Sequence, residues 1–487
     1  AAYRLKQSGV NYVIFEKNDA IGGTWLENTY PGCRVDVSNH VYCYSFMQKH
    51  DWPHFHSTQE VLLEYFNECA NHFGIRDDIR FSTEVSSAVW DEDSGRWVLE
   101  LAGEDGEETF ICHSIVSAVG QLNRPSYPDI DGRDSFKGPA WHSARWNHEE
   151  KIEGKNIAVI GTGCSAIQFI PRVAEEAAST TIFQRTPNWL MPRPQYQKEL
   201  PQNLLWCFDH IPFYNNWFRL HLFWRSHEGL LPRLEVDPEW DGNEDNSVSA
   251  SNHELGFMLR LYLESEFNDD PELLEKVTPR YTMGAKRFVI DDGLWATTLK
   301  RPDVTLCTDH IAEITETGLL TEDGTLYEAE AIIYGTGFKA SEFLTPMKIV
   351  GRGGIDLHEQ WDGVAQAYLG IVSPNFPNLF FMYGPNTNIV INGSIIYFSE
   401  CETHYISRYI QYLLENDITA LDVKKEVHDE YNVRIDEGNS QMAWGASSVN
   451  SWYKNPHGKI TQNWPFSLLE YWQQTREVNP NDYIELE

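Results

Sequence analysis

The chain has 487 residues, of which 41% are hydrophobic, and a formal net charge of −34 at pH 7. A chain of this length is expected to fold into two or more domains. No apolar run is long enough to span a membrane, so we expect no transmembrane segment. The acidity disfavours nucleic acid and anionic membrane surfaces as partners. The eight cysteines show neither paired nor metal-ligand spacing, so we expect no metal site and a reducing, cytoplasmic compartment.

The first residues indicate a nucleotide site that is half missing. Residues 1–9 predict the end of a helix that stops at Gly9, and the apolar run 11–15 predicts a strand followed by Glu16. An acid at this place binds the ribose 2′-hydroxyl of a dinucleotide without a 2′-phosphate. The glycine-rich loop of such a site lies about 20 residues earlier. We therefore expect this chain to lack the first strand and phosphate loop of the domain, which would weaken cofactor binding.

The elements that follow fit the remainder of such a domain. A Gly-Gly-Thr-Trp segment at 22–25 precedes a predicted helix near 58–73, and a meander of strands is predicted over 85–111. The apolar run 115–120 predicts a further buried strand. We assign residues 1–140 to the first part of a Rossmann-like domain.

A second nucleotide site is complete. The run 156–160 predicts a buried parallel strand, and it leads into Gly161-Thr-Gly163-Cys-Ser165-Ala166 at the start of a helix. Gly161 permits the tight turn, Gly163 lets the backbone approach a pyrophosphate, and Ala166 permits close packing of helix and strand. The helix N-terminus offers its free N–H groups to the phosphates. Small residues also occur in many ordinary strand-to-helix turns. The next strand therefore has to distinguish a nucleotide site from a purely structural turn.

That strand, predicted over 180–183, lies at the expected distance and is followed by Gln184, Arg185 and Thr186. A site for a free ribose 2′-hydroxyl would carry an acid here, whereas an arginine pairs with a 2′-phosphate. The sequence therefore favours NADPH over NADH at this second site.

The rest of the chain repeats the pattern of a parallel-sheet domain. Residues 201–285 predict a mainly helical insertion, and strands predicted over 304–337 close a second parallel sheet. We assign 150–200 and 286–340 to an NADP-binding domain and 341–487 to a return to the first domain with a C-terminal tail. The predicted fold class is α/β, with two Rossmann-like dinucleotide-binding domains and a helical insertion.

Two long motifs resemble those of flavin-dependent Baeyer–Villiger monooxygenases. Phe136-x-Gly138-x-x-x-His142-Ser-x-x-Trp146 matches the family fingerprint, with serine at a position that takes threonine or serine. The segment 22–36, with Gly-Gly-Thr-Trp, Tyr-Pro-Gly and Asp36, matches a second family motif that wraps the flavin. The resemblance covers nearly the whole chain.

Shorter segments are similar to the branch that includes 4-hydroxyacetophenone monooxygenase. These are residues 30–36, 384–387 and 451–455. The branch carries a further N-terminal extension, which we expect this chain to lack, and its substrates suggest aryl ketones.

The resemblance implies a reaction and roles for individual residues. NADPH reduces FAD, the reduced flavin adds O2 to form a C4a-peroxyflavin, and the peroxide attacks a ketone to give an ester or lactone. Arg287 then matches the arginine that stabilises the peroxide, and Asp36 the acid that holds this arginine. Lys286 joins Arg185 and Thr186 on the NADP 2′-phosphate. The remaining FAD contacts are those of Glu16 with the ribose and of Gly23, Thr24 and Trp25 with the flavin.

Other interpretations stay open at this point. One is a related flavin enzyme, either an S- or N-oxygenating monooxygenase or an NADPH:flavin reductase; the absence of a Cys-x-x-x-x-Cys pair argues against a disulfide reductase. Another is an inactive fragment that cannot hold FAD. His142 is equally explained as a structural residue that controls domain rotation, and Asp36 as an ordinary turn acid.

Overall fold

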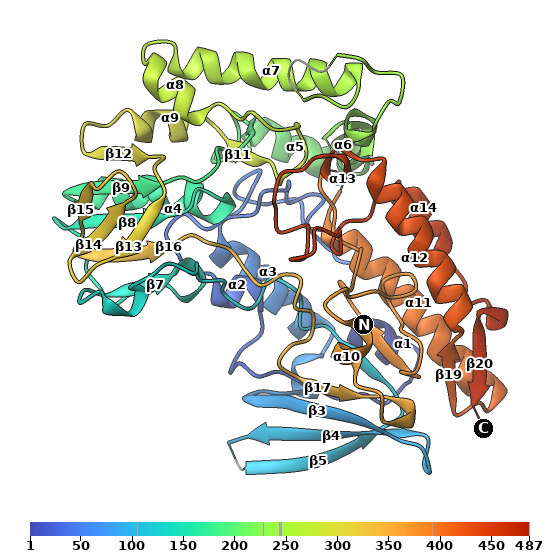
Figure 1. Ribbon diagram of the computed structural model, residues 1–487. Helices are drawn as coiled ribbons and strands as arrows, with labels where there is room; N and C mark the ends of the chain where they lie inside the picture. Colours follow the sequence, from blue (N-terminus) through green and yellow to red (C-terminus); the bar gives the residue numbers. More distant parts are fainter. Residues whose placement is uncertain (105, 227, 243–245, 392, 487) are drawn as a thin grey trace.

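The half of the protein for which we predict NADP binding (the NADP-side half) is built on a five-stranded, fully parallel sheet (Figure 1, left). The computed structural model describes residues 1–104, 106–226, 228–242, 246–391 and 393–486. In sheet order, the strands are β12 (Val304–Cys307), β9 (Ser179–Phe183), β8 (Asn156–Ile160), β16 (Ala331–Tyr334) and β7 (Ala140–His142). The helices packed on this sheet are α4 (Cys164–Glu176) and α9 (Leu294–Leu299). The strands predicted at 156–160 and 180–183 are thus confirmed.

A three-stranded antiparallel sheet lies beside this parallel sheet. Its strands are β13 (Ile311–Ile314), β14 (Gly318–Thr321) and β15 (Leu326–Glu328). Their apolar residues join those of β8 and β16 in one buried cluster, which includes Ile160, Phe183 and Leu319.

The insertion between the strands is mainly helical, as predicted, and it covers the top of the molecule in Figure 1. Its elements are β10 (Leu190–Pro192), α5 (Gln202–His210), α6 (Tyr214–Ser226), the 3₁₀-helix η4 (Glu228–Leu234), α7 (Ala250–Phe267), α8 (Pro271–Val277) and β11 (Val289–Asp291). Residues 227 and 243–245 of the predicted insertion lie outside the described residues.

The first domain contains two separate pairs of parallel strands. β1 (Ile14–Phe15) pairs with β2 (Ile79–Arg80), and β6 (Ile115–Ser117) pairs with β18 (Leu379–Phe381). Within the described residues, neither β1 nor β6 pairs with a strand on its other side. The predicted strands 11–15 and 115–120 were therefore too long: residues 11–13 have no ladder partner there, and after Ser117 the chain turns along a cavity, with Gly120 at φ +70°.

The remaining elements surround these strands (Figure 1). The predicted meander forms the strands β3 (Thr83–Asp91), β4 (Arg96–Gly103) and β5 (Gly106–Cys112), and β17 (Lys348–Val350) extends this sheet beside β3. The further helices up to residue 361 are α1 (Ala2–Gln7), α2 (Thr24–Glu27), α3 (Gln59–His72) and α10 (Leu357–Trp361), with 3₁₀-helices η1 (Arg76–Asp78), η2 (Arg133–Ser135), η3 (Ser143–Arg145) and η5 (Arg352–Gly354). The tail consists of α11 (Ile395–Asn416), β19 (Ala420–Val423), α12 (Lys425–Ser440), α13 (Ala443–Ala446), α14 (Leu468–Gln474), η6 (Pro480–Asp482) and β20 (Tyr483–Leu486).

The C-terminal part packs on the first domain, because β17 pairs with β3 and β18 with β6. This agrees with the predicted return of residues 341–487, although the exact domain limits remain a prediction. Within the part of the chain that the structure describes, no helix is long and apolar enough to cross a bilayer, and no cluster of side chains could hold a metal ion.

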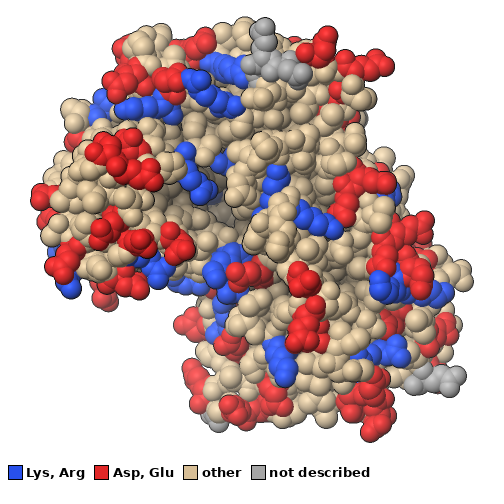
Figure 2. Space-filling view, in the orientation of Figure 1, with Lys and Arg blue, Asp and Glu red and all other residues tan. Residues whose placement is uncertain are grey.

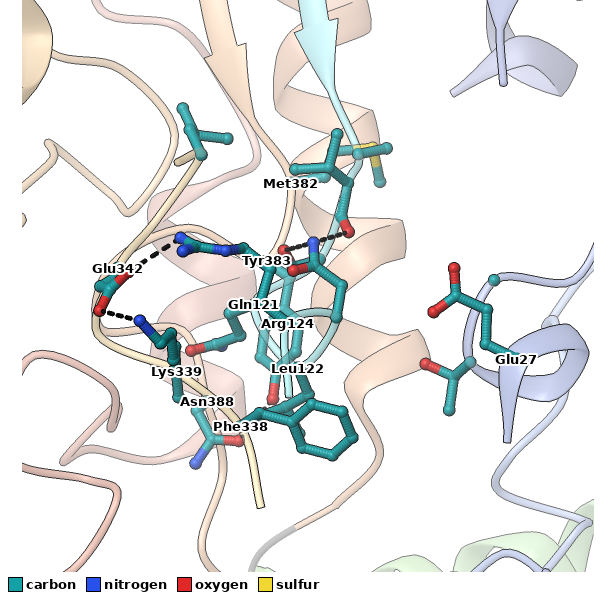
Figure 3. Close-up of a pocket in the computed structure, with 18 of the residues that line it drawn as sticks. Glu27, Gln121, Leu122, Arg124, Phe338, Lys339, Glu342, Met382, Tyr383 and Asn388 are labelled. Carbon is teal, nitrogen blue, oxygen red and sulfur yellow. Dashed lines mark hydrogen bonds and ion pairs between the residues drawn. The ribbon is translucent and has the colours of Figure 1, made fainter. Parts of the chain in front are cut away.

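The chain crosses between the two domains at two segments that lie side by side. Ser126 N–H donates to the Gly337 carbonyl over 2.8 Å, and Lys339 N–H donates to the Arg124 carbonyl over 2.9 Å. Figure 3 shows the Arg124 and Lys339 side chains directed toward Glu342. Arg124 Nη1 lies 2.9 Å from Glu342 Oε2, and Lys339 Nζ lies 3.4 Å from Glu342 Oε1. Together the two crossings form a short ribbon that joins the domains.

Candidate active site

A cavity of about 2520 Å³ opens between the two domains. The carboxyl ends of parallel strands meet here, which is where α/β proteins place their ligands. The cavity is lined by twelve of the predicted site residues: Glu16, Gly23, Thr24, Trp25, Asp36, Gly161, Gly163, Ser165, Arg185, Thr186, Lys286 and Arg287. Ala166 and the fingerprint residues Phe136, Gly138, His142 and Trp146 do not line it.

Asp36 and Arg287 form an ion pair at the cavity wall. Arg287 Nη2 donates to Asp36 Oδ2 over 2.5 Å. The Arg287 side chain is 25% exposed and the Asp36 side chain is 30% exposed. Burial by itself would raise the pKa of Asp36, but the charge and hydrogen bond of Arg287 outweigh it and hold that pKa below its usual value. Burial would lower the pKa of Arg287, and Asp36 raises it instead. Both groups are therefore charged, with a fixed cation facing the cavity.

Two backbone carbonyls complete the support of this arginine. Arg287 Nη1 donates to the carbonyls of Ile389 and Val390, each over 3.2 Å. These acceptors come from the segment after β18, more than a hundred residues along the chain. Sequence reasoning missed them, because a backbone carbonyl leaves no signal in the residue types. With three acceptors, the planar guanidinium has one defined orientation.

The glycine turn has the geometry that a dinucleotide site needs. Gly161 has φ +101°, and a Cβ there would lie 2.5 Å from the Gly335 carbonyl oxygen, so only glycine fits. Gly163 is the N-cap of α4, and a Cβ there would meet nothing within 4 Å. Ala166 is fully buried, and a Cβ added to Gly335 would lie 3.0 Å from the Cβ of Ala166. The turn is tightly packed on the protein side and open on the cavity side.

Two cations stand next to this turn. Burial and, to a smaller extent, the positive charge of Arg185 together lower the pKa of Lys286 to about 8. Among the described residues, no carboxylate forms an ion pair with either side chain, although the Lys286 ammonium lies 5.4 Å from the centre of the Tyr281 ring. Figure 2 shows a hollow with Lys and Arg side chains in and beside it, on a face that carries both acidic and basic side chains elsewhere. Two like charges held together without a counter-ion favour an anionic ligand.

The opposite side of the cavity carries the predicted FAD contacts. Glu16 follows β1, and its Oε1 accepts a hydrogen bond from Asn18 N–H over 2.9 Å. Gly23 has φ +50°, and a Cβ there would meet nothing within 4 Å. The buried Trp25 indole donates to the Tyr42 hydroxyl over 3.3 Å. Thr24 lies between these two residues at the start of α2.

The fingerprint residues pack behind the cavity. A Cβ on Gly138 would lie 2.5 Å from the Glu330 carbonyl oxygen. The His142 ring is fully buried, and burial lowers its pKa to about 4. Its Nδ1 accepts from Ala144 N–H over 3.1 Å, and its ring lies 5.8 Å from that of Phe338 in one crossing segment.

The outer residues of the fingerprint contact both sides of the parallel sheet. Trp146 packs against Phe169 of α4, with ring centroids 5.4 Å apart, and Phe136 packs on the cluster that contains Ile160. These contacts support a structural role for the fingerprint at the domain junction, and that role remains our proposal.

A polar network near the crossings was not anticipated. Tyr383 hydroxyl donates to Asn388 Oδ1 over 2.8 Å, and Asn388 in turn donates to Asn463. The buried Glu402 accepts from Tyr383 N–H. The Gln121 amide is 3% exposed and lines the cavity, and both of its polar atoms lack a partner among the described residues. Figure 3 shows Gln121, Tyr383 and Asn388 in the same pocket.

Comparisons with known proteins agree with this geometry. Residues 5–220 match the family model described as flavin-binding monooxygenase-like. Baeyer–Villiger monooxygenases of Streptomyces coelicolor and Pseudomonas aeruginosa are 33% and 32% identical to this chain; each match covers 99% of this chain, and 89% and 88% of theirs. The uncharacterized monooxygenase y4iD of Sinorhizobium fredii is 35% identical, over 99% of this chain and 73% of its own length.

Solved structures show the same architecture. A closed crystal structure of cyclohexanone monooxygenase superposes with a TM-score of 0.85 at 27% identity, covering 100% of this chain and 96% of that one. Oxidized steroid monooxygenase bound to NADP gives 0.83 at 28% identity, covering 100% and 97%. The class that this fold and site define is that of the flavin-dependent monooxygenases. Within this class, the chain belongs to the Baeyer–Villiger monooxygenase family. The similarities do not favour the other flavin activities or an inactive fragment.

Proposed function

We propose that this protein is an FAD-containing monooxygenase that uses NADPH and O2 to insert an oxygen atom next to a ketone carbonyl, giving an ester or lactone. The observation that carries the proposal is the fixed Asp36–Arg287 pair in the wall of a cavity that also holds a dinucleotide turn and two cations without an ion-pair partner among the described residues. A solved relative described as a complex with FAD and NADP superposes with a TM-score of 0.85, which supports both cofactors.

The residues present fit the two cofactors. The space in front of Gly23 and Gly163 is open, so that a cofactor can closely approach the protein backbone there. The buried, unpartnered amide of Gln121 suits a polar ligand atom in the same cavity. When bound, the flavin accepts a hydride from NADPH and activates O2.

Arg287 would act on the charge that develops during oxygen transfer. Its guanidinium stays protonated, and Asp36 and two carbonyls fix its orientation before the reaction. A preorganised cation in a partly enclosed cavity stabilises developing negative charge without having to reorient. Asp36 acts through Arg287 as its positioning acid.

The remaining predicted residues would hold the cofactors. The N-terminus of α4 at Gly163 and Ser165 would accept the NADP pyrophosphate, and Gly161 and Ala166 shape that turn. The NADP 2′-phosphate would lie against Arg185, Thr186 and Lys286, all of which line the cavity. Glu16 would hold the FAD ribose, and the segment Gly23–Trp25 would contact the flavin.

The substrate would be a small-molecule ketone, and the resemblance to the 4-hydroxyacetophenone monooxygenase branch makes aryl ketones the first class to test. We further propose a cytoplasmic location, because all eight cysteines are free although five of them are buried.

The test is to supply the purified protein with FAD and to follow NADPH oxidation with aryl and cyclic ketones, identifying products by mass spectrometry. We expect a bound flavin, ketone-stimulated NADPH oxidation and a product heavier than the ketone by one oxygen atom. A protein that oxidises NADPH but releases only hydrogen peroxide with every ketone would instead be a flavin reductase. A protein that binds no FAD would overturn the proposal.

A further inference from the structure

The Gln168 side chain joins the NADP-side helix to the segment that carries Asp36. Gln168 lies in α4, one turn beyond the glycine loop, and it lines the cavity. Its neighbours Ile167, Phe169 and Ile170 are buried apolar residues. A polar residue within this buried run needs partners for its amide, and the structure supplies them from outside the helix.

All four hydrogen-bonding positions of the Gln168 amide are used. Oε1 accepts from the Tyr30 hydroxyl over 2.9 Å and from Arg34 N–H over 3.4 Å. Nε2 donates to the Arg34 carbonyl over 3.0 Å and to the Tyr196 hydroxyl over 2.6 Å. A glutamine amide has two donors and two acceptor sites, so no other neutral side chain of this length could make all four contacts.

These contacts fix a short segment that ends at the active-site acid. The Gln168 amide forms hydrogen bonds with both the N–H and the carbonyl of Arg34, which lies two residues before Asp36. On the far side of the same segment, Val35 N–H donates to the Ser57 carbonyl over 3.2 Å. The segment is therefore held between α4 and the start of α3.

The segment also approaches α4 unusually closely. A Cβ on Gly32 would lie 2.7 Å from the Gln168 backbone carbonyl, and Gly32 has φ +80°. The Arg34 side chain also contacts Tyr196, because its Nη1 donates to the Tyr196 carbonyl over 3.1 Å. The contacts thus bring three separate parts of the chain to one point: residues 30–36, helix α4 and Tyr196.

We propose that Gln168 is a positioning residue that couples the NADP-side helix α4 to the Asp36–Arg287 pair. This inference rests on the proposed function, because it assigns Gln168 to the support of the same site. Gln168 keeps Asp36 at a fixed distance from the helix whose N-terminus faces the dinucleotide. Without the amide, Asp36 would still be present, but its position relative to α4 would no longer be defined.

The first test needs no cofactor. Hydrogen exchange of the ligand-free protein is compared between wild type and Gln168→Met, which has a similar length but forms no such bonds. We expect at least tenfold faster exchange of peptides covering residues 30–36, and unchanged exchange in β8. The matched control is Glu175→Gln, an exposed residue of the same helix whose partner is Arg172. Unchanged exchange of residues 30–36 in Gln168→Met would overturn the coupling.

The second test uses the FAD-loaded enzyme and a ketone that the wild type converts. In Gln168→Met, we expect the fraction of oxidised NADPH that appears as oxygenated product to fall at least fivefold, while KM for NADPH changes less than threefold. A merely structural role would lower the melting temperature and leave this fraction unchanged.

A double-mutant cycle further distinguishes a positioning role of Gln168 from a merely structural one. Tyr30→Phe removes one of the four contacts, and its effect on the product fraction should be much smaller in the Gln168→Met background than in wild type. Additive effects would contradict the proposal. If the wild type itself forms no oxygenated product, the proposed function fails, and the exchange experiment still decides whether Gln168 fixes the segment.

Discussion

Asp36 and Arg287 are 251 residues apart in the sequence, and their side chains meet at 2.5 Å. Asp36 follows a turn of the first domain, whereas Arg287 precedes β11, at the end of the helical insertion. The pair therefore forms only when the two halves of the protein are packed together, and its integrity reports on that packing.

The first prediction concerns this pair. Arg287→Ala should retain NADPH oxidation by the FAD-loaded enzyme but lose ketone oxygenation by roughly 10²–10³-fold or more, because the fixed cation is removed. Asp36→Asn should have a smaller effect in the same direction, since the arginine stays but is less well held. Both rates can be measured from NADPH absorbance and product formation. Full oxygenation by Arg287→Ala would exclude the assigned role.

The second prediction concerns the choice between NADPH and NADH. Arg185→Ala should raise KM for NADPH by roughly 10-fold or more, as expected for the loss of one charge-assisted contact of about 1.5–3 kcal/mol. The KM for NADH should change little, because NADH has no 2′-phosphate. Arg301→Ala, which removes an arginine paired with Asp303 outside the cavity, is the control. Equal effects on both cofactors would contradict the assignment.

A pH dependence follows from Lys286. Burial and Arg185 lower its pKa to about 8, so the ammonium loses its proton as the pH rises through that value. The neutral amine no longer attracts the 2′-phosphate, and KM for NADPH should therefore rise above about pH 8 while KM for NADH stays flat. In Lys286→Arg, the charge persists and the rise should disappear. The measurement is a KM profile from pH 6.5 to 9.5 for both cofactors.

The buried Glu402 predicts a pH effect on stability. Burial raises its pKa to about 8, only partly opposed by the hydrogen bond from Tyr383 N–H. The folded protein thus holds a proton that the unfolded chain releases above about pH 4.5, so this group stabilises the fold at low pH and loses that contribution as the pH rises through about 8. In Glu402→Gln, the melting temperature should fall less between pH 5 and 8 than in wild type.

The control for Glu402 is Glu415→Gln on the exposed side of the same helix α11. It should follow the wild-type pH profile. If the Glu402→Gln profile coincides with that of wild type, then Glu402 is ionised in the folded protein.

The dinucleotide turn could be predicted because each of its constraints acts locally. The run before Gly161 forms β8 at the predicted residues, and Arg185 follows β9 at the expected distance and faces the same cavity. These features depend on strand period, turn geometry and the charge of one side chain, and all three can be read from neighbouring residues.

The support of Arg287 and the role of Gln168 could not be predicted in this way. The carbonyls of Ile389 and Val390 can belong to any residue type, and the partners of Gln168 come from two other segments, residues 30–36 and Tyr196. A weak signal was present for Gln168, since it interrupts a buried apolar run of α4. The lengths of β1 and β6 were overestimated because apolar residues next to a cavity show the same pattern as residues within a strand.

The ribbon formed by the two crossing segments has a consequence for the architecture of the chain. Because Ser126 and Gly337 are hydrogen-bonded neighbours, residues 127–336 leave and re-enter the first domain at one point. The whole NADP-side half, including the helical insertion, is thus a single excursion within the chain of the other half. A short turn between Ser126 and Gly337 could therefore bridge the first domain in place of residues 127–336.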